Sequence, residues 1–248
     1  MVSSHAFSAS DREAVYRAIT QRRDIRHFVP GAIDPEMLKR LLHAAHCAPS
    51  VGLMQPWRFI RITDSGLRSR IHALVEAERV LTARALGERE DEFMRLKVEG
   101  VRECGELIVA ALMDGRDPHI FGRRTLPQMD VASVACAIQN LWLAARCEGL
   151  GMGWVSLFDP RKLGRLLAMP ADSEAIAILC IGHVDEFYSA PMLQLEGWRM
   201  PETVDSYIME NRWGANATSA DVKGADVKGP DVKSSEVKSA DVKGEPTS

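Results

Sequence analysis

The sequence has few of the features that mark disulfide-stabilised, zinc-knuckle or membrane-spanning proteins. Its five cysteines are scattered through apolar surroundings without a Cys-x-x-Cys pair, which argues against a disulfide framework and against a zinc knuckle. No uninterrupted apolar run reaches about 18 residues, and the N-terminal residues lack a basic segment followed by an apolar one. We therefore expect reduced thiols and a cytoplasmic protein that does not enter a membrane.

Net charge is almost absent as well. The 31 basic and 34 acidic residues leave a formal charge of −3, so no basic surface is expected for nucleic acid or an anionic membrane. A small anionic ligand can still meet local arginines. With 46% hydrophobic residues in a chain of 248, a sizeable core can form, and one domain is the simplest organisation.

The composition changes abruptly after Trp213. From Ser219 onward a unit resembling Ala-Asp-Val-Lys-Gly recurs five times. One valine per unit cannot repay the entropy of ordering the other four residues. The sequence thus predicts a folded domain over residues 1–214 and a disordered, low-complexity repeat tail over 215–248, for which a docking function is the alternative.

Helix signals are clear in the first fifty residues. Ser10 and Glu13 form a capping box for a first helix that ends at the pair Arg22-Arg23. Asp34 and Pro35 supply an N-cap and a favoured first residue for a second helix, which stops near residue 49.

Further along, apolar and β-branched runs predict buried strands at residues 59–63, 107–113, 154–158 and 175–184. The stretch from 67 to about 100 is rich in Arg, Glu, Ala and Leu and predicts helix, interrupted near Gly87. Such an amphipathic excursion could form a lid.

The helix predicted over residues 131–147 is apolar on nearly every side. Such a helix must be buried on nearly every side. In a domain of this size, that predicts a central helix packed between a sheet and a partner subunit, and therefore a homodimer.

The densest charged cluster is Arg22-Arg23-Asp24-Ile25-Arg26. Guanidinium groups repel one another unless an anion lies among them, and their planar fork suits phosphate geometry. The segment indicates a phosphate-binding turn, with a solvated basic turn partly neutralised by Asp24 as the alternative. Two or three such contacts fall short of the about 8 kcal/mol that micromolar binding requires, so the ligand also needs a large apolar body.

Two loops could receive that body. The segment 48–57 combines Ser, Gln and Trp with Gly and two Pro, which suits the edge and faces of a planar ring, although an ordinary connector fits equally well. In the segment 148–156 a helix precedes Gly-x-Gly-x-Gly and a strand follows, the reverse of a dinucleotide-binding fingerprint. These glycines are expected to end the helix and to let backbone approach a flat ligand closely.

No metal site is predicted. His43, His46 and Cys47 lie on about one turn of the second helix, but no carboxylate belongs to that set, and packing or surface positions account for it.

Four segments in the same order carry a family resemblance: Arg-Arg-Asp-Ile-Arg-x-Phe at 22–28, Ala-Pro-Ser-Val-Gly-Leu-Met-Gln-Pro-Trp at 48–57, Gln-Asn-Leu-Trp-Leu-Ala-Ala-Arg at 139–146 and Gly-Leu-Gly-Met-Gly-Trp-Val-Ser at 149–156. Over residues 8 to 214 the chain resembles the nitroreductase-like flavoproteins and, within them, the 5,6-dimethylbenzimidazole synthases (the BluB family). The resemblance implies an α+β fold with a central mixed sheet flanked by helices, in an intertwined homodimer with FMN at the subunit interface.

The resemblance also implies roles for individual residues. It assigns cofactor binding to Arg22, Arg23, Asp24, Ile25, Arg26, Ser50, Leu96 and Ser156. Asp24 stands where ordinary nitroreductases usually carry serine or another small polar residue. It and Ser156 match the aspartate and serine that the synthases require to fragment the flavin, so both are expected to be catalytic.

The activity implied is oxygen-dependent fragmentation of reduced FMN, the substrate, into 5,6-dimethylbenzimidazole, the lower ligand of vitamin B12, and erythrose 4-phosphate. Molecular oxygen is the co-substrate, and a separate flavin reductase supplies the reduced FMN because no nicotinamide site is recognisable. An NAD(P)H-dependent nitroreductase or flavin reductase is the main alternative, and a non-catalytic flavin-binding or corrinoid-precursor-binding protein is another.

We predict that removing residues 215–248 leaves the fold and the activity nearly unchanged, because the repeat has no capacity to form a core. Activity and oligomeric state of the truncated and full-length chains should be compared side by side. A truncated protein that is folded and dimeric yet inactive would contradict the prediction.

Overall fold

The computed structural model describes residues 5–214. Residues 5–200 belong to one compact unit, and residues 201–214 are the described part of a second unit that contains the short helix η3 (Val204–Tyr207). The predicted repeat tail at 215–248 lies outside the described residues, so its disorder stays a prediction.

The first unit alternates helices with strands. In chain order its elements are α1 (Ala9–Gln21), α2 (Pro35–His46), η1 (Val51–Leu53), β1 (Trp57–Arg61), α3 (Ser65–Ala85), η2 (Gly87–Arg89), α4 (Glu90–Arg95), β2 (Glu106–Leu112), α5 (Met129–Cys147), β3 (Gly151–Val155), α6 (Pro160–Leu166), β4 (Glu174–Gly182) and α7 (Met192–Leu195).

The four strands form one sheet in the order β1-β2-β4-β3, and every pair of neighbouring strands is antiparallel. The resemblance implies a mixed sheet. Among the described residues its parallel component is limited to an isolated bridge between Asp24 and Met152 at the β3 edge. That bridge also brings the segment after α1 to the sheet.

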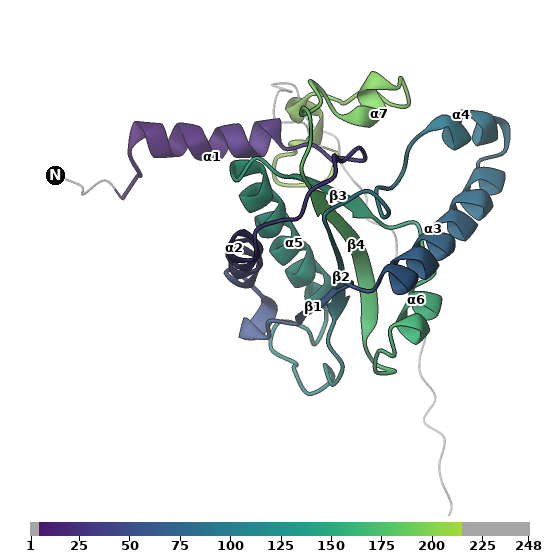
Figure 1. The fold of residues 1–248 in the computed structure, drawn as a ribbon. Coiled ribbons are helices and arrows are strands. Elements are labelled where there is room, and N and C mark those ends of the chain that lie inside the picture. Colours follow the sequence, from purple (N-terminus) through teal and green to yellow (C-terminus); the bar gives the residue numbers. More distant parts are fainter. Residues whose placement is uncertain (1–4, 215–248) are drawn as a thin grey trace, which may run out of the picture. The chain divides into compact units, whose positions relative to one another are not determined.

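Helices cover both faces of the sheet, with α2 and α5 on one and α3 and α6 on the other (Figure 1). Side chains on a strand alternate between the faces. In β4, Leu179 and Ile181 join the core beneath α5, whereas Ile178 and Cys180 join the core beneath α3 and α6. The central strands are thus buried on both sides, as their apolar runs predict.

The local signals for α2 are confirmed, and those for α1 are shifted. Asp34 caps α2 by accepting from the Glu36 N–H at 3.1 Å, and Pro35 is its first residue. For α1 the expected N-cap Ser10 is wrong, because Ser8 occupies that position and accepts from the Asp11 N–H at 3.2 Å. Ser8 and Ser10 are two positions apart and both are suitable N-cap residues, and the earlier one caps the helix.

The strand predictions are right in number and shifted in position. The third strand begins at Gly151 rather than Trp154, so two of the glycines assigned to a ligand contact belong to β3. Only Gly149 has a left-handed backbone, with φ of +78°, as expected after a helix end. The other two allow a close approach of other parts of the protein. A Cβ on Gly151 would lie 2.5 Å from Val184 Cγ1, and a Cβ on Gly153 would collide with the Ile25 carbonyl oxygen and lie 2.6 Å from Arg26 Nη1.

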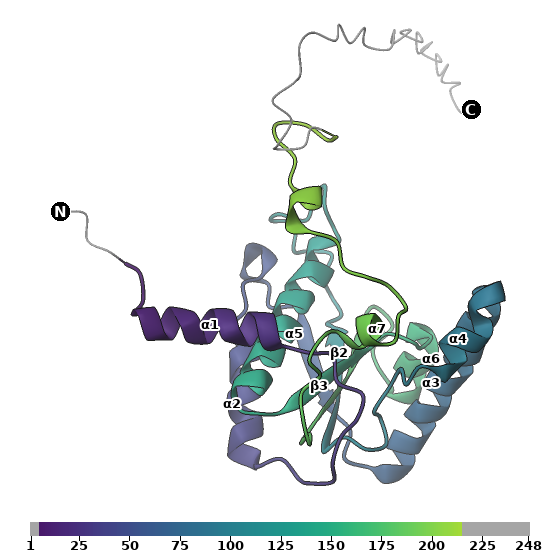
Figure 2. The same ribbon diagram turned by 90° about the horizontal axis from the view of Figure 1, so that it is seen from above.

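The helical excursion predicted for residues 67–100 is found over residues 65–95, with the predicted break near Gly87, whereas residues 96–100 are not helical. Gly87 has a φ of +58° and begins η2, between α3 and α4. The resulting arm, α3–η2–α4, extends beside the sheet in both views (Figures 1 and 2). A small separate core of Ala83, Phe93 and Leu96 holds its outer part.

The helix α5 packs on the sheet and on α2 along one side, but its opposite side is open in the single chain. Val131, Cys136, Gln139 and Cys147 are exposed there. The expectation of burial all around this helix is therefore not met within one chain. Among residues 5–214, no helix is long and apolar enough to cross a membrane, and all five cysteines are free thiols.

We predict that Gly153→Ala destabilises the fold by about 1–3 kcal/mol, because the added methyl group has no space against residues 25–26. Urea unfolding measures the change. Gly164→Ala is the matched control: its nearest neighbour would be Met169 Cβ at 4.0 Å, and alanine should be neutral or stabilise α6 by up to about 1 kcal/mol. Equal stability of the two variants would show that the close approach at β3 imposes no constraint.

Candidate active site

The segment after α1 lies along the edge strand β3. The Ile25 N–H donates to the Met152 carbonyl at 3.0 Å, and the Ile25 side chain is fully buried. Asp24 and Arg26, its neighbours, are thereby fixed on either side of this anchor. Ile25 can reach a ligand through its backbone only, because its side chain belongs to the core.

Asp24 and Arg26 form a closed arrangement with Trp154 of β3. One carboxylate oxygen of Asp24 accepts from the Trp154 N–H at 3.0 Å, and the other pairs with Arg26 Nη2 at 2.5 Å. The same Nη2 donates to the Trp154 carbonyl at 2.8 Å. These contacts hold the carboxylate in one orientation while 42% of its side chain stays exposed.

Burial raises the pKa of Asp24 despite this positive surrounding. The loss of hydration outweighs the opposing effects of Arg26, the Trp154 N–H and Arg22. The nearby arginines, which favour the ionised form, are thus the smaller effect. An aspartate with a raised pKa is a better proton acceptor once it is ionised.

The Arg26 guanidinium is nearly fully buried, with 8% of its side chain exposed, and only Nη2 has hydrogen-bond acceptors. Nε and Nη1 have none among the described residues. Leaving charged donors buried and unpaired is costly. The positive charge of this arginine suits an anionic or acceptor-rich ligand such as a flavin, while Nε and Nη1 themselves are covered by protein in the single chain.

The other two arginines of the cluster point elsewhere. Arg22, half-buried, places its guanidinium 4.5 Å from the centre of the Trp142 ring, and burial lowers its pKa. Arg23 donates to the carbonyls of Tyr188 and Ser189 at 3.0 and 3.1 Å, which ties the segment after β4 to the end of α1. In the single chain each arginine has its own partners, so a common anion stays a prediction.

A cavity of about 190 Å³ opens beside Asp24. Four of the predicted site residues line it: Asp24, Arg26, Leu96 and Ser156. The remaining walls are mostly apolar and come from the arm, from β3 and the residues after it, and from the α7 segment: Phe93, Val98, Trp154, Val155, Leu157, Met192, Leu193 and Trp198. A polar corner with an apolar body is the character expected of a site for a planar heteroaromatic ring.

Trp198 and Phe93 are lining residues that the sequence does not reveal. Their rings lie 6.2 Å apart, and Arg89 of η2 stacks on Trp198 with its guanidinium carbon 3.4 Å from the ring centre. The tip of the arm is thus fastened to the segment after α7. No periodicity in the sequence marks either aromatic residue as a partner of the other.

Ser50 does not join this group. Its Oγ accepts from the Gln55 N–H at 3.0 Å, and the adjacent Val51 N–H donates to Ser133 near the start of α5. The Arg23 turn contacts Trp142 near the other end of α5. Nine residues of helix separate Ser133 from Trp142, roughly 13 Å along the axis.

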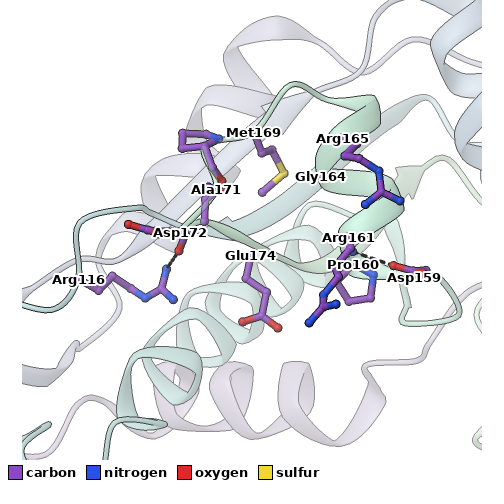
Figure 3. A pocket seen from close by; sticks show the side chains of 12 residues that line it. Arg116, Asp159, Pro160, Arg161, Gly164, Arg165, Met169, Ala171, Asp172 and Glu174 are labelled. Atoms are coloured by element: carbon purple, nitrogen blue, oxygen red, sulfur yellow. Dashed lines mark hydrogen bonds between the residues drawn. The ribbon is translucent and has the colours of Figure 1, made fainter.

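A larger cavity, of about 840 Å³, has none of these residues in its lining, which Figure 3 shows. It is bordered by α6, by the loop that leads into β4 and by Arg116, which donates to the Asp172 carbonyl at 2.7 Å. Its charged lining residues are mixed in sign and mostly exposed. Without an apolar body or an unpaired buried group, it is a weaker candidate for the flavin.

Residues 19–183 match the nitroreductase family model. The solved structure of oxidised iodotyrosine deiodinase with FMN and 3-iodo-L-tyrosine has the same fold: the TM-score is 0.63 at 23% identity, over 80% of this chain and 100% of that chain. The fold is therefore that of the nitroreductase class.

Two relatives give a finer assignment. The chain is 42% identical to a 5,6-dimethylbenzimidazole synthase of Rhodospirillum rubrum, over 78% of this chain and 92% of the relative, and 38% identical to one of Rhodobacter capsulatus, over 78% and 94%. The chain belongs to the nitroreductase family and, within it, to the 5,6-dimethylbenzimidazole synthases.

Proposed function

We propose that this protein fragments reduced FMN with molecular oxygen and releases 5,6-dimethylbenzimidazole and erythrose 4-phosphate. Its similarity to two synthases over nearly their whole length supports the overall reaction. The observation that carries the site assignment is the cavity that Asp24, Arg26 and Ser156 line together, in which a nearly buried guanidinium pairs with a carboxylate.

Reduced flavin supplies the reactivity toward oxygen, so the reaction needs no further redox group. Arg26 would stabilise negative charge on the flavin through its guanidinium group. The Asp24 carboxylate, fixed by Trp154 and Arg26, would accept a proton during fragmentation. Ser156 would orient the reacting edge through its hydroxyl group. The apolar walls would keep water away from the ring.

The reduced flavin would come from a separate flavin reductase. No nicotinamide-binding site is recognisable among residues 5–214. The cavity beside Asp24 is also small. A pocket of about 190 Å³ is below the roughly 300 Å³ that ligands of this size require. Part of the flavin would therefore be enclosed by other surfaces.

A second copy of the chain would provide those surfaces. The helix α1 has a single buried residue, Ala18, while Val15, Tyr16 and Ile19 are exposed. An isolated helix of 13 residues is marginal in water, so packing against another surface would stabilise it. The open side of α5 needs the same cover, and a partner's Ser50 loop could then complete the site that Asp24 begins.

We predict that excess reduced FMN in air yields 5,6-dimethylbenzimidazole with the unaltered protein, whereas a flavin reductase would only let the flavin reoxidise. In Asp24→Asn, which keeps the shape and loses the base, flavin affinity should change little and product should fall by about 100-fold or more. Chromatography of the product and flavin fluorescence provide the two measurements.

Asp185→Asn is the matched control, because Asp185 is an exposed aspartate in the turn after β4. It should retain normal product formation. Product that recovers in Asp24→Asn at saturating reduced FMN would refute the catalytic role and leave Asp24 as a charge-balancing residue. Reoxidation without product in the unaltered protein would refute the proposed function.

We also predict a stable homodimer. Tyr16→Asp should shift it toward monomers and lower activity, because a charge would enter the apolar face of α1, whereas Lys39→Asp on exposed α2 should not. Light scattering coupled to size exclusion measures the mass. A fully active monomer would show that one chain completes the site.

A further inference from the structure

Three metal-ligating side chains converge at the base of the arm, outside the proposed flavin site. His72 and Glu76 are four residues apart on α3 and share one face of the helix. Glu99 reaches the same point from the segment between α4 and β2. One potential ligand atom from each of the three lies within 4.8 Å of the other two.

Glu99 is the notable member, because its side chain is nine-tenths buried. One carboxylate oxygen accepts from the Val101 N–H at 2.5 Å. The other has His72 Nε2 at 3.5 Å as its ionic partner among the described residues, beyond ordinary hydrogen-bond length. A buried carboxylate without a close cation is costly.

Asp130 shows how this fold otherwise neutralises a buried carboxylate. It is similarly buried, and Arg116 Nε and Arg123 Nη2 approach it at 3.1 and 3.0 Å. These two fixed positive charges compensate its negative charge. Glu99 has one imidazole nearby, where Asp130 has two guanidinium groups, so the negative charge of Glu99 is compensated less completely.

The spacing of the donors suits a metal ion. Ligand atoms held 2.0–2.2 Å from a tetrahedral ion lie roughly 3.3–3.6 Å from each other. The separation of 3.5 Å between His72 Nε2 and Glu99 Oε1 falls in that range. Glu76 completes the set from the solvent side, where 35% of its side chain is exposed.

Glu76 must release its present partner to reach an ion. That partner is Arg79 Nη1 at 3.3 Å, in a part-buried pair with 35% of the Glu76 side chain and 19% of the Arg79 side chain exposed. Arg79 would keep its position afterwards, because its Nη2 donates to the carbonyls of Met94 and Leu96 at 2.6 and 3.2 Å. One imidazole and two carboxylates favour a divalent transition ion over magnesium or calcium.

We propose that His72, Glu76 and Glu99 bind one divalent transition ion of the zinc type, in a structural site that braces the arm. The ion would join α3 to the segment that follows α4, which closes the base of the excursion. Leu96 and Val98, on the cavity beside Asp24, are within three residues of Glu99. The site adds a metal where the sequence predicts none, and the ion takes no part in the chemistry of the proposed reaction.

The test is titration of the metal-free full chain with Zn²⁺ alone, followed by calorimetry. One equivalent per chain should bind, and saturation at about 100-fold over the dissociation constant should raise the thermal midpoint by roughly 5–10 °C. Both effects should be lost in Glu99→Gln, which keeps the shape and the acceptor for the Val101 N–H. They should also be lost in Glu76→Gln, a partly exposed substitution that spares the core.

A competing surface site needs its own control. His43 Nε2 and Cys47 Sγ are 3.7 Å apart on exposed α2 and could take up zinc adventitiously. The titrations are therefore made in a His43→Ala, Cys47→Ser background, where binding should persist. Co²⁺ titration distinguishes the two, because thiolate-to-cobalt absorption arises only at Cys47 or another cysteine.

The proposal is overturned if no zinc binds in that background, or if Glu76→Gln binds as much zinc as the parent protein. In either case the cluster is a plain ion pair of His72 with Glu99. A Glu99→Gln variant that fails to fold does not remove the test, since Glu76→Gln decides it.

Discussion

The passage of residues 24–26 along the edge strand β3 is the constraint on which the site depends. It requires glycine at position 153, where a Cβ would collide with the Ile25 carbonyl oxygen, and at position 151, where a Cβ would lie 2.5 Å from Val184 Cγ1 and 3.1 Å from the Ile25 side chain. In return, the Ile25 N–H bonds to the sheet and its side chain enters the core. Asp24 and Arg26 are then placed on a rigid element rather than on a free loop, which is the condition for a precise site.

Part of this arrangement can be predicted from the sequence, namely the part that depends on local signals. The part that depends on contacts between distant residues cannot. Local signals suffice for α2, whose cap and first proline act within one turn, and for the break at Gly87. The start of β3 is missed because Gly151 and Gly153 interact with residues 25–26, more than a hundred positions away. Trp198 is missed for the same reason: its partners Phe93 and Arg89 lie on an element that local periodicity cannot relate to it.

How completely a buried charge is paired distinguishes structural positions from candidate ligand sites in this fold. The negative charge of Asp130 is compensated by two arginines at 3.1 and 3.0 Å. Arg26 is compensated in part, by Asp24 and a carbonyl, while two of its nitrogens are unpaired. Glu99 has one imidazole and one N–H. Since unpaired buried charge is costly, Arg26 and Glu99 are two positions where binding can stabilise the fold.

Both incomplete positions meet the same arm. Leu96 lines the cavity beside Asp24, and Glu99 follows three residues later in the cluster at the arm's base. At the far end, Arg89 and Phe93 fasten the arm to Trp198. The helix α3 is held on the sheet by Ile71 and Val75, whereas the outer part of the arm has only a small core of Ala83, Phe93 and Leu96. That outer part depends on its other contacts for its position. Whatever neutralises Glu99 therefore also steadies one wall of the cavity in which Asp24 and Ser156 lie.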